Sequence, residues 1–353
     1  MQDTAKLGCL PTFDDMHNLC AVYVDMGTTN TRVWLAHGDH IFARSNQAIG
    51  IRDAARGERG KLRAALHNLI AGVQDQTPAS CSPAYVAAAG MITSALGLIE
   101  LPHIQSPAGL QELAMAASWH HFSDISDLPV LLVPGLRSGA ADPTLDSIHE
   151  ADVMRGEETL CAGLVALRLV QPPAVVINLG SHWKAVQIGQ NGKIESSITT
   201  VSGELIHTAQ QHTILASSVS SGQPGDLTMD WIDAGMREQR RSGLARALFC
   251  VRLLHLANEG TANDRFAFLV GAFIASDLDA FVSRSVLKAG RPAVLVGNPA
   301  VVQAWKGALS QAGIAATVIT PTQVESALLK ALQHILLAAV PKLQSVSHKV
   351  VSE

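Results

Sequence analysis

Apolar residues occupy alternate positions on both sides of a short polar turn near the start of the chain. The alternating apolar positions are Val22, Val24, Val33 and Leu35, and the turn between them reads Asp25-Met-Gly-Thr-Thr-Asn30. Period-two alternation of β-branched residues is typical of strands, and glycine beside small polar residues is typical of tight turns. Residues 21–35 are therefore predicted to form a strand, a turn and a second strand.

A second stretch repeats this pattern at a constant offset and without a gap. In that alignment Asn178 falls on Asp25, Gly180 on Gly27, Ser181 on Thr28, Val186 on Val33 and Ile188 on Leu35. A further hairpin follows each copy, at Gly38-Asp39 in the first and at Asn191-Gly192 in the second. Internal repetition on this scale indicates two similar halves, each opening on the same strand, turn and strand.

The remaining apolar pattern fills both halves with alternating helices and strands. Helical spacing predicts helices within 60–73, 109–121, 150–170, 229–258, 265–289, 299–311 and 327–340, and short apolar runs predict strands at 83–89, 130–135, 196–201, 292–298 and 317–320. We expect an N-terminal extension over 1–19, a first lobe over 20–172 and a second lobe over 173–353. The fold class is α/β.

Composition supports a globular protein with two sizeable cores. The chain has 353 residues, of which 48% are hydrophobic and 16% charged, and its formal net charge is −4. This length suits two lobes, and a mildly negative charge gives no general attraction to nucleic acid or to an anionic membrane. Residues 1–19 lack the long apolar run of a signal peptide, and the apolar stretch 327–340 is shorter than a membrane span. We therefore expect no nucleic-acid partner and no membrane partner.

The cysteines point to a reducing compartment. They are Cys9, Cys20, Cys81, Cys161 and Cys250, an odd number that is widely scattered and contains no C-x-x-C pair. This spacing argues against a disulfide framework and against a zinc site. We expect the protein to be cytoplasmic.

The first turn has the chemistry of an anion site. Backbone amides and the hydroxyls of Thr28 and Thr29 are suitable donors to phosphate oxygens, and Asp25 at the strand end is suited to hold hydrated Mg²⁺ beside them. Two such turns, one from each half, would grip a polyphosphate from both sides. An ordinary hairpin with a glycine turn remains the alternative from these residues alone. Arg32 and Lys184 follow the two turns, and strand alternation leaves open whether they face phosphates or solvent.

Six blocks, in order and spanning most of the chain, carry a resemblance to a known family. They are Val24–Trp34, Ala89–Ser94, Val133–Leu136, Asp152–Thr159, Gly180–Lys184 and Ser202–Leu205. With them the chain resembles the 2-dehydro-3-deoxygalactonokinase family, within the actin, hexokinase and acetate kinase superfamily. The resemblance implies two actin-like (ribonuclease H-like) lobes with an interlobe cleft, which close over ATP and a substrate.

The resemblance implies a sugar-acid kinase that uses ATP and Mg²⁺. Its reaction would transfer the γ-phosphoryl group to the terminal 6-hydroxyl of 2-dehydro-3-deoxy-D-galactonate, giving the 6-phosphate in galactonate catabolism. Two alternatives stay open, a kinase for another sugar or sugar acid and a non-catalytic actin-like protein that binds nucleotide. The expected partner is a small-molecule sugar acid, and a homodimer remains open because sequence does not fix the oligomeric state.

The resemblance also assigns roles to individual residues. Phosphate binding falls to Gly27, Thr28, Thr29, Asn30, Gly180, Ser181, His182 and Lys184, and adenosine binding to Gly297 and Asn298. Substrate binding falls to Thr93, Ser94, Arg155 and Glu204, and Asp25 would bind Mg²⁺ through water.

Related sugar kinases place a catalytic carboxylate at the start of a helix shortly before the second turn. Glu157 and Glu158 match this position, and Glu158 is our first choice as the base, with Asp152 as an outside candidate. A helix N-terminus favours an ionised carboxylate, which would be ready to accept a proton. The alternative is structural, because glutamate is common in a first helical turn where it offsets the dipole.

Overall fold

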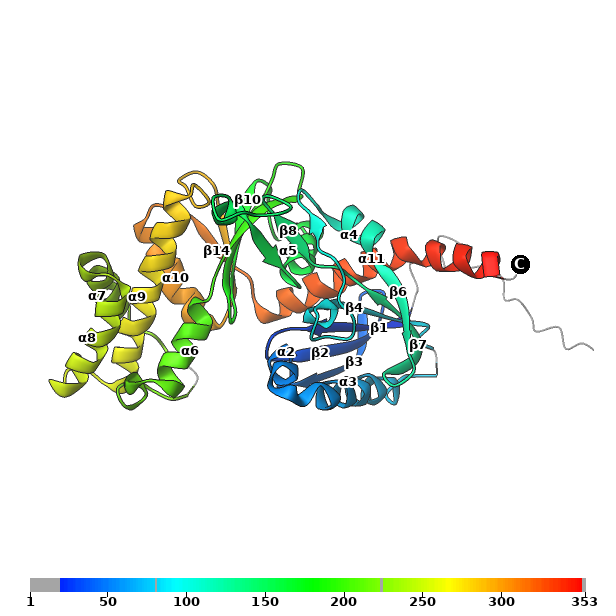
Figure 1. The fold of residues 1–353 in the computed structure, drawn as a ribbon, viewed down its shortest axis with the longest axis horizontal. Helices are drawn as coiled ribbons and strands as arrows, with labels where there is room; N and C mark the ends of the chain where they lie inside the picture. The colour runs from blue at the N-terminus through cyan, green and yellow to red at the C-terminus, as the bar shows by residue number, and fades with distance from the viewer. Residues whose placement is uncertain (1–19, 80, 223–224, 351–353) are drawn as a thin grey trace, which may run out of the picture. The chain divides into compact units, whose positions relative to one another are not determined.

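The computed structural model describes residues 20–79, 81–222 and 225–350, so the expected extension over 1–19 lies outside the described residues. The chain divides into two compact units (Figure 1). Unit 1 takes the described residues of Met1–Ile104, Leu110–Gly135 and Leu328–Glu353, and unit 2 takes Gln105–Gly109 and Leu136–Ala327. Residues 136–172 thus group with the second half of the chain, whereas the expected boundary between lobes lay at 172/173.

Unit 1 is built on a six-stranded sheet with the order β3-β2-β1-β4-β7-β6. The strands are β1 (Cys20–Met26), β2 (Thr31–His37), β3 (His40–Gln47), β4 (Tyr85–Gly90), β6 (Ser118–Phe122) and β7 (Ser126–Leu132). The first three pair antiparallel, β4 and β7 continue parallel to β1, and β6 closes the edge antiparallel. The predicted strand, turn and second strand over 21–35 are confirmed.

One helix covers the face of this sheet on which the alternating apolar residues lie. Helix α3 (Arg59–Gln74) runs along β1, β2 and β3 (Figure 1). Its buried Leu62, Leu66 and Ile70 join Val24 and Val33 in one core. A short helix α2 (Ile51–Asp53) and a π-helical turn over Ala54–Glu58 lead into it. The helix predicted within 60–73 is confirmed.

Unit 2 repeats the same sheet with the order β12-β11-β10-β13-β14. Its strands are β10 (Ala174–Leu179), β11 (Trp183–Ile188), β12 (Ile194–Thr200), β13 (Ala293–Gly297) and β14 (Ala316–Val318). The first three again pair antiparallel, and β13 and β14 again run parallel to the first strand. The five strands match β3-β2-β1-β4-β7 of unit 1 in order and sense, which confirms the two similar halves expected from the repeat and the α/β fold class.

The second copy of the turn is one residue shorter than the first, which corrects the gapless alignment. Asp25 pairs across the hairpin with Arg32, whereas Asn178 pairs with Lys184. Because side chains alternate between the faces of a strand, one missing residue moves every later side chain to the other face. Val33 lies in the helix-covered core of unit 1, and its structural equivalent in unit 2 is the core residue Ala185 rather than Val186.

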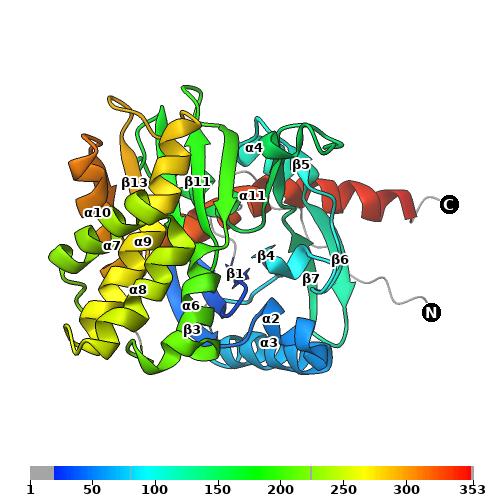
Figure 2. The same cartoon turned by 60° about the vertical axis from the view of Figure 1, so that its left-hand side comes forward.

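Helices cover the core face of the second sheet. They are α6 (Ser202–His212), α7 (Met229–Ser242), α8 (Leu244–Leu256), α9 (Ala262–Ser283) and α10 (Pro299–Gln311). Figures 1 and 2 both show α7, α8 and α9 side by side. Helix α9 is the one described helix that is long and apolar enough to cross a membrane, yet 72% of its most apolar window is buried, as in a core helix.

Two predicted helices are shorter than expected. The pattern over 109–121 forms α4 (Leu110–Ala116) followed by strand β6, because the aromatic residues after Ala116 suit an edge strand and Trp119 donates to the carbonyl oxygen of Ala339. The pattern over 150–170 forms β9 (Asp152–Met154) and then α5 (Glu157–Ala166). Gly156, whose φ of 108° favours glycine, separates the two elements.

The described chain also has 3₁₀ helices at Ile148–Glu150 and Ile214–Ser217, a small sheet and one long helix. Strands β5 (Ile104–Gln105), β8 (Leu136–Ser138) and β9 form a small sheet, and α11 (Pro321–Val350) begins in unit 2 and continues in unit 1.

The cysteine spacing argued against a disulfide framework, but one pair of cysteines is bonded in the structure. Cys20 at the start of β1 and Cys81 before β4 are joined by a disulfide, with a Cα–Cα distance of 5.9 Å. The two strands are parallel neighbours, so residues far apart in sequence begin side by side. Of the other described cysteines, Cys161 and Cys250 are free thiols.

Candidate active site

The first turn is held so that it presents hydrogen-bond donors. The Gly27 amide donates to the Asn30 carbonyl oxygen at 2.8 Å, which closes the turn. The carbonyl oxygens of Gly27 and Thr28 accept hydrogen bonds from the first amides of α2, at 3.3 and 3.0 Å. A Cβ on Gly50, just before α2, would lie 2.6 Å from the Thr28 carbonyl group, so only glycine allows this approach. With the carbonyl oxygens of Gly27, Thr28 and Asn30 engaged, the turn offers the hydroxyls of Thr28 and Thr29 to an anion.

Asp25 lies at the end of β1, directly before this turn. Its side chain is 16% exposed, and Oδ2 is 3.5 Å from the Arg32 guanidinium on β2. A partly exposed carboxylate beside hydroxyl donors is suited to a hydrated cation. No group of three or more His, Cys, Asp or Glu side chains able to hold a metal occurs among residues 20–79, 81–222 and 225–350.

The end of β4 lies next to the end of β1. Gly90 pairs with Met26, and a Cβ on Gly90 would overlap the Met26 carbonyl oxygen. The chain then turns through Met91–Thr93, where the buried Thr93 hydroxyl donates to the Gly90 carbonyl oxygen at 3.1 Å. Ser94 is only partly buried and donates to the Met91 carbonyl oxygen at 2.7 Å. Of these two predicted substrate residues, Ser94 is thus the one whose side chain is partly accessible.

The second turn packs against the start of α6. Gly203 is the second residue of that helix, and a Cβ there would overlap the carbonyl oxygen of Gly180 and come within 2.8 Å of that of Ser181. His182 Nε2 is 3.3 Å from the Glu204 carboxylate, with both side chains about two-fifths exposed. The structure therefore brings together His182 and Glu204, which the sequence placed in different roles.

We expect Gly203→Ala to disrupt this contact. The added methyl group meets backbone atoms, which cannot rotate away, so α6 must move off the turn. The expected result is a KM for ATP raised about 10-fold and an unfolding free energy lowered by about 1–3 kcal/mol. Gly60→Ala is the matched control, because Gly60 is also the second residue of its helix and nothing lies within 4 Å of its Cβ position. Equal KM values for the two variants would contradict the assignment.

Asp277, a buried residue of α9 that the sequence analysis did not single out, is hydrogen-bonded to the segment that leads into α6. The Thr200 hydroxyl donates to Asp277 at 2.6 Å and lies 3.1 Å from the Ser202 hydroxyl. Burial raises the pKa of Asp277 to about 6, and hydrogen bonds from Thr200 and Ser202 oppose the rise. Asp277 thereby fixes the segment that links β12 to α6. Its position in a helical apolar run gave no local signal for this role.

The two residues expected to bind adenosine follow β13, at the same end of the second sheet as the second turn. Gly297 ends β13 beside Leu179, the last residue of β10, and its φ of 147° together with a Cβ contact of 2.7 Å to Leu179 requires glycine. Asn298 caps α10, because its side chain accepts a hydrogen bond from the Ala300 amide at 3.0 Å. Ligands of open α/β sheets bind at the carboxyl ends of parallel strands, which is where these residues lie.

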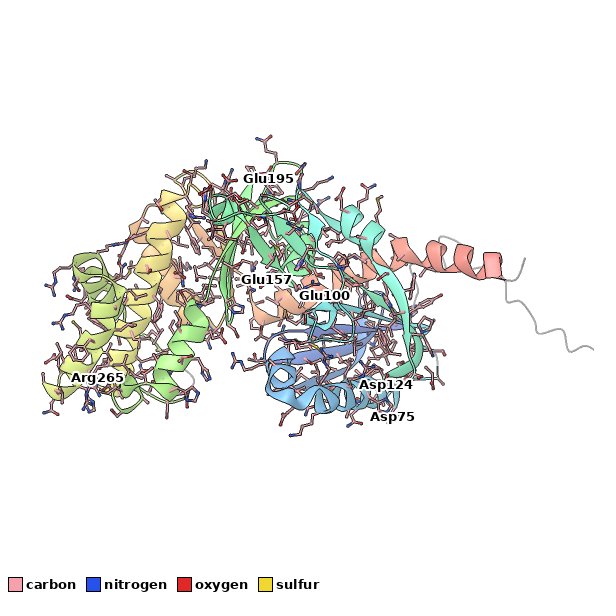
Figure 3. All side chains as sticks on the ribbon, in the orientation of Figure 1. Asp75, Glu100, Asp124, Glu157, Glu195 and Arg265 are labelled. Atoms are coloured by element: carbon pink, nitrogen blue, oxygen red, sulfur yellow. A yellow bond between two sulfur atoms is a disulfide. The ribbon has the colours of Figure 1, made fainter. Side chains whose placement is uncertain are left out.

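The two candidate bases differ sharply in environment. The Glu158 side chain is fully buried, both carboxylate oxygens accept the Gly156 amide at 2.9 and 2.8 Å, and Thr159 donates to one of them at 3.1 Å. Burial raises the pKa of Glu158 to about 7, and the nearby Glu157 adds to the rise. Glu157, the first residue of α5 and labelled in Figure 3, is partly exposed.

A pKa near 7 would suit a general base, but the geometry of Glu158 argues against that role. A base must reach a substrate proton, and a side chain without exposed surface whose oxygens bind its own backbone has no such reach. Successive helical residues point in directions about 100° apart, which is why one glutamate faces inward and the other does not. The structure therefore shifts our first choice from Glu158 to Glu157.

The ammonium group of Lys184, which we expected to bind phosphate, is hydrogen-bonded within the protein. Its side chain is only 3% exposed, and its ammonium donates to the Val153 carbonyl oxygen and to the Thr199 hydroxyl, both at 2.6 Å. The shorter second turn places Lys184 on the face opposite to Trp183 and the helix-covered core. Arg155, partly buried, follows β9 on the segment between Asp152 and α5.

Comparison with known proteins identifies relatives over most of the chain. A family model described as 2-keto-3-deoxy-galactonokinase matches residues 25–335. A protein of Rhizobium meliloti named a probable 2-dehydro-3-deoxygalactonokinase is 29% identical over 296 residues, which cover 82% of this chain and 89% of that protein. The 2-dehydro-3-deoxygalactonokinase of Escherichia coli is 27% identical over 263 residues, 73% of this chain and 80% of that protein.

A solved structure has the same fold. The crystal structure of a protein from Sinorhizobium meliloti described as a 2-dehydro-3-deoxygalactonokinase superposes with a TM-score of 0.70 at 26% identity. The match covers 89% of this chain and 97% of that one. The match therefore includes both units.

Proposed function

Because the chain belongs to the 2-keto-3-deoxy-galactonokinase family, a family of kinases, we propose that it transfers the γ-phosphoryl group of ATP to the 6-hydroxyl of 2-dehydro-3-deoxy-D-galactonate. The product would be the 6-phosphate, as expected for a step in galactonate catabolism. The observation that carries the proposal is the repeated turn, which follows the first strand of each sheet with hydroxyl side chains, Thr28 and Thr29 in one unit and Ser181 in the other.

The donor groups of both turns fit phosphate oxygens. In the first turn the carbonyl oxygens of Gly27 and Thr28 are bound to α2, and the second turn packs against α6 beside His182. We propose that Gly27, Thr28, Thr29 and Asn30 bind phosphate from one turn and that Gly180, Ser181 and His182 bind it from the other. Lys184 is left out of this set because its ammonium is bound elsewhere.

Asp25 fits a hydrated Mg²⁺, since its carboxylate is partly exposed at the strand end beside the first turn. Bound Mg²⁺ would offset the charge of the phosphate oxygens during transfer. Asp25 would hold the ion through water, which suits a cation that gives up its waters reluctantly.

Glu157 is the proposed general base. It would accept the proton of the sugar hydroxyl, and its place at the N-terminus of α5 favours the ionised carboxylate. Arg155, two residues earlier, is proposed to bind the substrate carboxylate, with Glu204 and Ser94 as acceptor and donor for sugar hydroxyls. Gly297 and Asn298 are proposed to contact adenosine. The metabolic role of the family supports a cytoplasmic enzyme with a small-molecule sugar acid as its partner.

Coupled ADP release tests the proposal over a panel of substrates. Mg·ATP is offered with 2-keto-3-deoxy acids, aldonic acids and neutral hexoses. We expect strong turnover with 2-dehydro-3-deoxygalactonate and little with the others. Turnover with a different sugar acid alone would reassign the substrate, and binding of ATP without any stimulated turnover would leave a nucleotide-binding protein of the actin-like type.

A further inference from the structure

A buried lysine links the strand that follows the second turn to the segment that carries the proposed base. Lys184 is on β11, two residues after His182, and its ammonium donates to the backbone carbonyl oxygen of Val153 on β9 at 2.6 Å. The next residues after β9 are Arg155 and Gly156, and α5 then begins at Glu157. One hydrogen bond therefore joins the strand after the second turn to the segment that carries Arg155 and Glu157.

The ammonium charge is compensated inside the protein. Asp152 Oδ2 lies 4.0 Å from Lys184 Nζ and is itself hydrogen-bonded by the hydroxyls of Thr199, at 2.9 Å, and Ser197. Thr199 also accepts a hydrogen bond from Lys184 at 2.6 Å. The four side chains come from β9, β11 and β12 and form one closed network. Buried charges need such partners, and networks of this kind fix a single geometry.

Strand β9 is held by its pairing with β8, by the buried side chain of Met154 and by the hydroxyl hydrogen bonds to Asp152. It is three residues long and lies at the edge of the small sheet, where it pairs with β8. The Val153 side chain is 54% exposed, so packing of that side chain contributes little to the position of its backbone. The hydrogen bond from Lys184 is a restraint that acts on the backbone of Val153, two residues before Arg155.

The equivalent position in unit 1 is used differently. There the residue is Arg32, which is half exposed and pairs with Asp25 across the hairpin at 3.5 Å. In unit 2 the cross-strand partner of Lys184 is Asn178, which carries no charge, and the lysine reaches the Asp152–Val153 segment instead. The equivalent cations of the two hairpins therefore bind different groups, Arg32 the Asp25 carboxylate and Lys184 the Val153 carbonyl oxygen.

We propose that Lys184 is a positioning residue, whose hydrogen bond to Val153 sets the place of Arg155 and Glu157 relative to the second turn. The inference rests on the proposed function for its kinetic consequence. Small displacements of a catalytic group lower the rate strongly while leaving binding of a substrate held by other groups nearly intact. Lys184 therefore acts on kcat through Glu157 and not through contact with ATP.

Kinetics of Lys184→Met test the proposal against a phosphate-binding role. We expect kcat to fall about 30- to 100-fold with KM for ATP within about 3-fold of the wild type. Lys306→Met, at an exposed lysine of the same unit, is the matched control and should leave both constants unchanged. A KM for ATP raised 10-fold or more with unchanged kcat would overturn the proposal in favour of phosphate contact.

The double variant Asp152→Asn/Lys184→Met separates positioning from general stability. Removing both charges should recover thermal stability relative to Lys184→Met, because no unpaired buried carboxylate remains. It should not recover kcat, because the bond to Val153 is still missing. Recovery of kcat together with stability would overturn the proposal.

Amide hydrogen exchange gives a readout that does not depend on the substrate. In Lys184→Met we expect the peptide covering 152–158 to exchange at least 10-fold faster, with α9 unchanged. Unchanged exchange there would overturn the positioning role even in an active enzyme. If exchange is faster but the protein has no sugar-acid kinase activity, the restraint of the 152–158 segment by Lys184 stands and only the proposed function is rejected.

Discussion

Replacing Glu157 by Gln is expected to lower kcat by about 10²- to 10⁴-fold, with KM for ATP and for the sugar acid changed little. The amide keeps the shape of the side chain and loses the ability to accept the hydroxyl proton. Glu157 is the partly exposed member of the pair at the start of α5, so the substitution leaves no buried group unpaired. Steady-state ADP release over a range of both substrates measures the effect.

Glu195→Gln is the control for this prediction. Glu195 is an exposed carboxylate on β12 of the same unit (Figure 3), and its loss should leave kcat unchanged. If Glu157→Gln keeps at least a third of the wild-type kcat, Glu157 is not the base. A loss confined to Glu158→Gln would return the assignment to Glu158.

Glu158→Gln is expected to change how stability depends on pH. Burial raises the pKa of Glu158 from its ordinary 4.5 to about 7, so between these values the folded protein holds a proton that the unfolded chain has lost. The unfolding free energy of the wild type therefore falls as pH rises through this window, and a neutral glutamine does not share the loss. Relative to the wild type, the variant should gain about 2–3 kcal/mol between pH 5 and pH 8.

Urea unfolding of both proteins at the two pH values measures this gain. Comparing variant with wild type cancels other groups that titrate in the window, including Asp277, whose pKa is also raised. Glu195→Gln again serves as control and should show no pH-dependent difference. A constant difference between Glu158→Gln and wild type would mean that the Glu158 carboxylate is not held as described.

The fold was predictable because its main signals are local and repeated. Alternation around residues 22–35 indicates the first hairpin, and its recurrence at 175–188 indicates the second half without reference to the strand order. Helical spacing located α3 and α10 within one or two residues of their ends. These features depend on the period of the apolar pattern, which sequence shows directly.

Features that depend on distant contacts were not predictable in the same way. The pairing of Cys20 with Cys81 follows from the adjacency of two parallel strands, and the burial of Glu158 follows from the way α5 packs. The missing residue in the second turn moved Lys184 to the other face of its strand, which a gapless alignment hid. All three are set by register or packing, and none of them is visible in a short sequence motif.

Phosphorus NMR of the reaction product tests the central claim most directly. Mg·ATP and 2-dehydro-3-deoxygalactonate are incubated with the wild-type protein, and the phosphorus signal of the product is correlated with proton signals. The predicted result is a phosphomonoester coupled to the two protons on C6. Inorganic phosphate without a phosphoester, or a phosphoester coupled to another carbon's proton, would contradict the proposed transfer.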